Sequence, residues 1–171
     1  MSYFRKRVQR QLLKLAMVVV GTASMCLATV SVTVLEAMER MVASGASAGD
    51  LSGVINTWLV AWQKVRHLCD SNLNLNAERY TVRPHVRLSP ILARLEDKLR
   101  AIQASPDMGA EAILAAARAA FFATVDELAE FDDWVKTAGR EVDFDAARYE
   151  GEAASRAEHR WLRIAGQIAR T

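Results

Sequence analysis

Apolar and polar positions alternate with a helical period along most of the chain. Apolar residues recur at intervals of three and four, which gives each segment one apolar face. This pattern predicts five helices, over residues 2–42, 50–69, 89–104 and 109–138, and from 143 or 145 almost to the end. In the third helix, the charged residues from Glu96 to Arg100 are expected on the side that faces solvent. The predicted fold class is all-α, with a long N-terminal (transmembrane) helix followed by a four-helix antiparallel bundle.

The most apolar segment is an uncharged run between Lys14 and Glu36. It contains twenty-one residues, Leu15 to Leu35. As an α-helix such a run is about 31 Å long, which is close to the hydrocarbon thickness of a bilayer. We therefore predict one membrane-spanning helix in an N-terminal domain of residues 1–43. Residues 44–171 are predicted to form a helical bundle domain, with an irregular loop over 70–88.

Other interpretations of the uncharged run stay open. The run contains several hydroxyl residues, which favour a buried helix in a soluble bundle, although such side chains in a membrane can bond to their own backbone. A strand is another alternative, because Val30, Val32 and Val34 alternate with polar residues. The basic start also suits a mitochondrial address, whereas a cleavable signal would have a shorter apolar region.

Charge is distributed unevenly between the start of the chain and the rest. The first fourteen residues contain five cations and no acid: Arg5, Lys6, Arg7, Arg10 and Lys14. Cations flanking a spanning helix are typical of its cytoplasmic or matrix side. We expect a signal anchor in an inner membrane, with the N-terminus in the cytoplasm or mitochondrial matrix. We also expect these five residues to lie at an anionic membrane surface.

The body of the chain is slightly acidic. From Glu36 onward it contains seventeen Lys and Arg against twenty acids, within a net charge of +2 for all 171 residues. Nucleic-acid binding is not expected from this balance.

Small residues line one face of the first helix. They fall at spacings of three and four, and the same face continues with larger apolar residues: Gly21, Ser24, Ala28, Ser31, Leu35 and Met38. Small side chains let two membrane helices approach closely. We predict that this seam packs against another subunit or a second copy of the chain. The alternative is chance spacing in a segment rich in alanine and valine.

The loop over 70–88 combines basic and aromatic residues, namely Arg79, Tyr80, Arg83, His85 and Arg87. A loop of this length inside a compact domain is uncommon unless it binds something. We predict that it contacts an acidic partner, a lipid headgroup or a phosphate. The alternative is an extended connector whose arginines are solvated.

No motif for chemistry emerges from the sequence. The three histidines are not part of the Glu-x-x-His pairs of a di-iron bundle, and no phosphate loop or nucleophile motif is present. The two cysteines, Cys26 and Cys69, are interpreted as small buried hydrophobic residues. We expect neither a metal nor another cofactor, and no enzymatic activity.

The first functional hypothesis is a non-catalytic, single-pass inner-membrane accessory or scaffold subunit of a larger assembly. Its partners would be membrane lipids and other membrane protein subunits, or the chain itself. One alternative is a membrane-tethered sensor with a ligand pocket lined by Trp58, Trp62, Phe121 and Trp134. Another is a soluble all-helical structural protein of an oligomer or filament.

Overall fold

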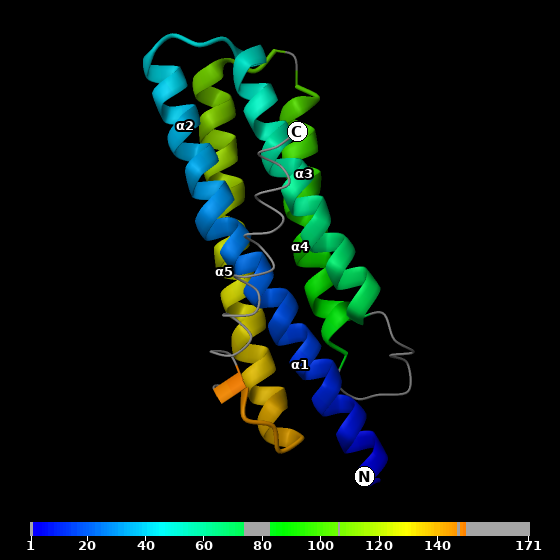
Figure 1. Cartoon of the computed structure of the whole chain (residues 1–171). Helices are drawn as coiled ribbons and strands as arrows, with labels where there is room; N and C mark the ends of the chain where they lie inside the picture. The colour runs from blue at the N-terminus through cyan, green and yellow to red at the C-terminus, as the bar shows by residue number, and fades with distance from the viewer. Residues whose placement is uncertain (1, 74–82, 106, 147, 150–171) are drawn as a thin grey trace, which may run out of the picture.

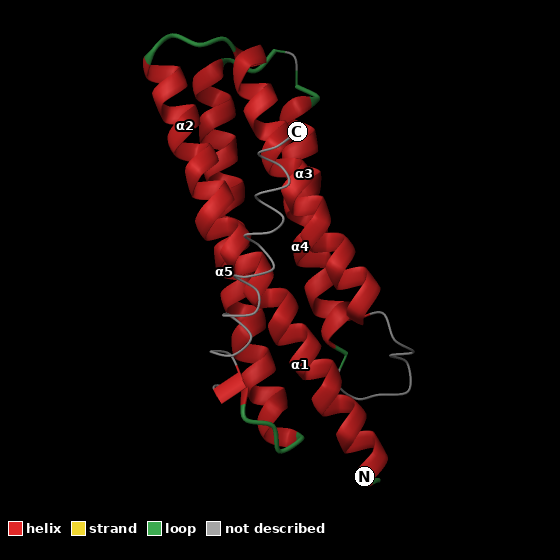
Figure 2. Ribbon diagram, in the orientation of Figure 1, coloured by secondary structure: helices red, strands yellow, loops and turns green. Residues whose placement is uncertain are grey.

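The computed structural model of the chain describes residues 2–73, 83–105, 107–146 and 148–149. These residues form long helices and, within the described ranges, no strand. Figure 2 shows this helical architecture. The prediction of an all-α fold with a long, apolar N-terminal helix is confirmed.

The long helices run alternately up and down. The elements are α1 (Tyr3–Cys26), η1 (Leu27–Ser31), α2 (Val32–Ala43), α3 (Ala48–Leu73), α4 (Pro84–Gln103) and α5 (Ala110–Glu141). The first three form one continuous helix, as predicted, with a π-helical turn at η1. Each of the following helices reverses direction (Figure 1), so that neighbours along the chain are antiparallel.

The N-terminal helix is one of the helices of the bundle. Its α1 part packs against α3 and α5, and α3 packs in turn against α4. One hydrophobic core contains buried residues from every helix, including Leu13 and Met38 of the first and Trp58 of α3. The predicted boundary between residues 43 and 44 therefore does not separate two cores. The predicted fifth helix lies almost entirely outside the described residues.

The first helix, from Tyr3 to Ala43, is long and apolar enough to span a membrane by length and composition. Within the fold, however, 50% of its most apolar stretch is buried. Lipid and a neighbouring helix cover an apolar face equally well. The hydropathy of the run alone could not distinguish between them.

The π-helical turn changes the phase of the first helix. The backbone N–H of Val32 donates to the carbonyl of Leu27, five residues back, where an α-helix would use the residue four back. One extra residue in the turn rotates everything after it by about 100° relative to a regular α-helix. Buried positions accordingly move from Ala23, Cys26 and Leu27 to Ser31, Val34 and Leu35.

Two helices begin earlier than predicted. Ser47, and not Asp50, precedes α3, and the Asp50 carboxylate accepts hydrogen bonds from the backbone and side chain of Ser47 at 2.9 and 2.7 Å. These bonds lower the pKa of Asp50. Helix α4 begins at Pro84, where proline fits the first helical position because no intrahelical partner exists there for the N–H that it lacks. Pro90, predicted at the start of this helix, lies inside it.

Gly139 lies inside α5 and does not end it as a cap. The helix continues to Glu141, and the residue with positive φ is Asp143, at 56°. A Cβ atom on Gly139 would lie 3.0 Å from the carbonyl oxygen of Phe144. Glycine is therefore used here for the close approach of the chain that folds back after α5.

Candidate functional site

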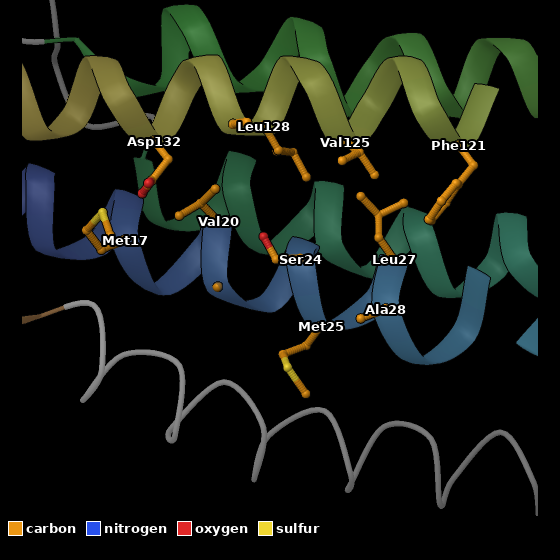
Figure 3. Close-up of a pocket in the computed structure, with 12 residues that line it drawn as sticks. Met17, Val20, Ser24, Met25, Leu27, Ala28, Phe121, Val125, Leu128 and Asp132 are labelled. Carbon is orange, nitrogen blue, oxygen red and sulfur yellow. The ribbon is translucent and has the colours of Figure 1, made fainter. Parts of the chain in front are cut away.

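A groove lies on the described surface between the N-terminal helix and α5, called the α1/α5 groove below. It has a volume of about 440 Å³. Figure 3 shows α1 and η1 forming one wall and α5 the other. The lining residues are Met17, Val20, Gly21, Ser24, Met25, Leu27 and Ala28 on the first wall, and Phe121, Val125, Leu128, Ala129 and Asp132 on the second.

The two walls differ in the size of their side chains. The first helix presents small residues at Gly21, Ser24 and Ala28, of which the last two are exposed. The α5 wall presents Phe121 and Val125, and Val125 is 39% exposed. A wall of small residues leaves space beside the backbone of α1 into which the side chains of another helix can fit.

The groove is almost entirely apolar. Its charged group, Asp132, is half-buried and forms an ion pair with Lys136 one helical turn away, at 2.7 Å. The Ser24 hydroxyl adds one polar group (Figure 3). Sites for small polar ligands have several converging polar groups, so this lining favours an apolar occupant.

The structure divides the seam of small residues predicted on the first helix. Gly21, Ser24 and Ala28 line the groove. Ser31, Leu35 and Met38 are buried in the chain's own core, with exposed fractions of 0%, 8% and 0%. The π-helical turn between the two halves supplies the rotation that separates them, and no sequence signal marked this turn.

The five cations of the basic start are also divided. The Arg10 side chain donates to the carbonyl of Val142 at 3.0 Å and pairs with Asp143 at 3.2 Å. The Lys14 Nζ lies 5.5 Å from the centre of the Tyr149 ring. Arg10 and Lys14 thus contact the chain that follows α5. The other three cations, Arg5, Lys6 and Arg7, are exposed.

The predicted loop over 70–88 is shorter in the structure, because residues 70–73 belong to α3 and residues 84–88 belong to α4. Arg79 and Tyr80 lie outside the described residues. Arg83 precedes α4, His85 is half-buried in its first turn, and the Arg87 guanidinium stacks on Trp134 at 4.9 Å from the ring centre. Arg87 thereby contributes to a second cleft, of about 310 Å³, between α4 and α5.

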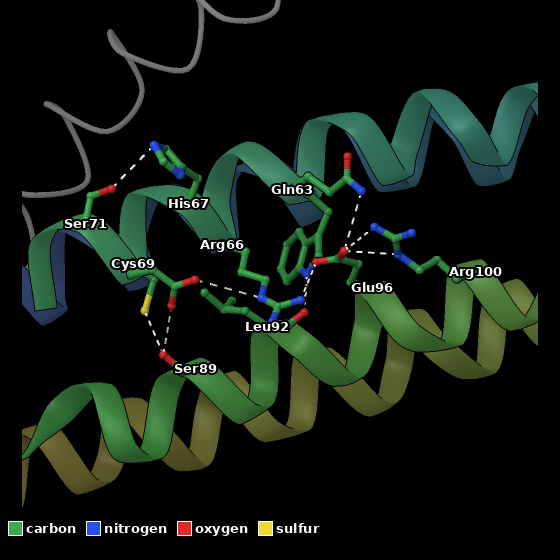
Figure 4. Close-up of polar contacts among 11 residues, drawn as sticks. Gln63, Arg66, His67, Cys69, Ser71, Ser89, Leu92, Glu96 and Arg100 are labelled. Atoms are coloured by element: carbon green, nitrogen blue, oxygen red, sulfur yellow. Dashed lines mark hydrogen bonds and ion pairs between the residues drawn. The ribbon is translucent and has the colours of Figure 1, made fainter. Parts of the chain in front are cut away.

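A buried carboxylate joins α3 to α4 (Figure 4). Glu96 is 6% exposed, although the sequence predicted it on the solvent side. Arg66 and Arg100 donate to its two oxygens at 2.8 and 2.7 Å, and Gln63 donates at 3.4 Å. Burial would raise the pKa of Glu96, but the bonds from Arg66 and Arg100 more than offset this and lower it. A carboxylate so fully paired holds helices together and does not transfer protons near neutral pH.

Both cysteines, Cys26 and Cys69, are also buried in the core. Burial raises the pKa of Cys69 to about 11, so its thiol is not ionised at neutral pH. In the described part of the chain, no three His, Cys, Asp or Glu side chains are grouped so that they could hold a metal ion. The sequence-based ligand pocket is not formed, because Trp58 and Trp62 are fully buried whereas Phe121 and Trp134 line different clefts.

Comparison with known protein families, curated proteins and solved structures finds no match to this chain.

Proposed function

We propose that this protein is a non-catalytic accessory or scaffold subunit of a membrane-associated assembly, and that its α1/α5 groove binds one apolar helix of another subunit. The observation that carries the proposal is the pairing of a small-residue wall, Gly21, Ser24 and Ala28, with an open apolar wall on α5. Phe122 extends this apolar surface next to the groove, since it is 61% exposed and its ring contacts Phe121 at 5.3 Å between centres.

A helix suits the groove better than a small ligand does. The lining runs from Met17 to Ala28 along one wall, which corresponds to about 17 Å of helix. Helix-in-groove recognition relies on such an elongated apolar surface and needs few polar contacts. A ligand-sensing function has less support, because one ion-paired carboxylate and one hydroxyl offer little to orient a small molecule.

For location we propose the cytoplasmic or matrix face of an inner membrane. The basic start of the chain suits that side of the bilayer. Beside the uncharged run, α4 and α5 carry the ion pair of Arg94 with Glu127 and that of Asp132 with Lys136. A bilayer around the closed bundle would have to enclose these charges, which is costly. We therefore propose that the bundle stands in water at the membrane surface.

Site-specific photo-crosslinking in native cells tests the groove. A photoreactive residue at Ala28 should yield one discrete adduct, whereas the same residue at Thr57, exposed on α3, should not. Mass spectrometry should place the adduct in an apolar helical segment of another protein. Adding Gly21→Leu should reduce the adduct at least tenfold, because the larger side chain fills the groove.

Three results would contradict the groove proposal. The first is an adduct with residues 150–171 of the same chain, and the second is an adduct with a second copy. The third is an adduct whose yield is unaffected by Gly21→Leu in a variant that folds normally. Circular dichroism and thermal melting of the purified Gly21→Leu chain check its folding.

A further inference from the structure

The first turn of α1 has aromatic and cationic side chains that the bundle does not use. Tyr3 and Phe4 are 80% and 67% exposed, the highest values among the large hydrophobic residues described. Arg5, Lys6 and Arg7 follow directly and are exposed, and none of the three side chains forms an ion pair or hydrogen bond with a described residue. We call residues 3–7 the N-terminal tip.

The tip lies beyond the last contacts of the helix with the chain that follows α5. Arg10, the next cation along α1, is engaged with Val142 and Asp143. Figure 1 shows the N-terminal turns of α1 at one end of the bundle, extending past the start of α4. A rigid helix therefore presents the tip away from the bundle.

We propose that the N-terminal tip binds the surface of an anionic lipid bilayer and holds the bundle there without spanning the membrane. Aromatic rings partition to the headgroup region, and cations next to them are attracted to anionic lipids. Each Lys or Arg close to such a surface strengthens binding by about fivefold. The three cations of the tip together account for roughly a hundredfold gain.

This proposal rests on the side chains of the tip and not on the backbone N–H groups at the end of the helix. Ser2 already caps that end, because its hydroxyl accepts from the backbone N–H of Arg5 at 3.4 Å. A nucleic acid is a poorer fit, because it would require a wider basic face. Near the tip, Asp143 lies against Arg10 and lowers the local positive charge.

The inference extends the membrane location proposed above, but it does not depend on the groove. Purified full-length protein is sedimented with phosphatidylcholine vesicles, with and without phosphatidylglycerol. We expect binding only when the anionic lipid is present, and we expect high salt to release the protein. The Gly21→Leu variant should bind vesicles as the wild type does. Failure of the groove proposal in the crosslinking experiment is therefore distinguishable from failure of the tip proposal in vesicle binding.

Two sets of variants make the test specific. Arg5→Gln with Lys6→Gln and Arg7→Gln should weaken binding roughly a hundredfold, and Tyr3→Ser with Phe4→Ser at least tenfold. The matched control removes three exposed cations elsewhere, by Arg40→Gln, Lys64→Gln and Lys98→Gln, and should change binding less than threefold. Equal losses in the two triple variants would overturn the proposal, as would binding without anionic lipid or protein that salt does not release.

Discussion

At the scale of single residues, the most consequential side chain is the carboxylate of Glu96. The period of α4 and the charges beside it suggest a solvated position, yet it is 6% exposed. Arg66 reaches it from α3, thirty positions earlier in the chain. A carboxylate with several charge-assisted bonds stabilises the folded state only while it is ionised.

We expect Glu96→Gln to lower the free energy of unfolding by about 1–3 kcal/mol at neutral pH, because it removes the charge from the bonds with Arg66 and Arg100. The pKa of Glu96 is lowered in the folded state, so its contribution is present above the pKa of the unfolded chain and is lost as the pH falls through the lowered value. Urea denaturation between neutral and acidic pH should therefore show the variant and the wild type converging. The control Asp97→Asn removes a neighbouring exposed charge and should cost less than about 0.5 kcal/mol. A difference in the free energy of unfolding between Glu96→Gln and the wild type that stays constant as the pH falls would contradict this account.

At the scale of the elements, the π-helical turn η1 decides which residues of the first helix are buried. A regular helix would place Gly21, Ser24, Ala28 and Ser31 on one face. The extra residue in the turn instead leaves the first three at the groove and takes Ser31 into the core. One inserted residue therefore determines both which side chains line the groove and which side chains of α2 pack into the core.

Deletion of Thr29, which is exposed in η1, should convert the turn to regular α-helix and keep the buried faces on either side in phase. We expect the shortened chain to fold with a stability within about 1 kcal/mol of the wild type. Deletion of Glu36, exposed in α2, should instead rotate Met38 out of the core and cost more than about 2 kcal/mol. Urea denaturation of both chains measures the difference. If the two deletions lowered the free energy of unfolding by similar amounts, η1 would not determine which face of the helix is buried.

At the scale of the whole molecule, the apolar run serves as the first helix of a closed bundle. Half of its most apolar stretch is covered by the fold. The other side of the run, at Thr29 and Thr33, is exposed and carries hydroxyls. Spanning a bilayer would require this helix to leave α3 and α5 and to expose the core around Trp58 and Trp62.

Thr29→Lys distinguishes the closed bundle from a spanning helix. On the closed bundle the lysine points into water, so we expect the melting temperature and the cellular fraction of the protein to be unchanged. Near the middle of a spanning helix the same lysine would cost about 2.5–3.5 kcal/mol. Ala23→Lys, at a position that is 0% exposed, serves as the destabilised control. Loss of Thr29→Lys from the membrane fraction, with normal folding of the purified chain, would contradict the closed bundle.

Helical periodicity and helix-ending residues are local properties, so the sequence alone predicts the class of the fold, the long continuous first helix and the approximate extent of α3, α4 and α5. What covers the first helix is a property of the tertiary structure, since lipid tails are about as apolar as the side chains of α3 and α5 that pack against this helix. The burial of Glu96 likewise depends on a residue far away in the chain, because Arg66 reaches it from α3, thirty positions earlier. The different roles of the five N-terminal cations also depend on distant residues. Arg10 donates to the carbonyl of Val142, and no pattern near the N-terminus indicates this contact.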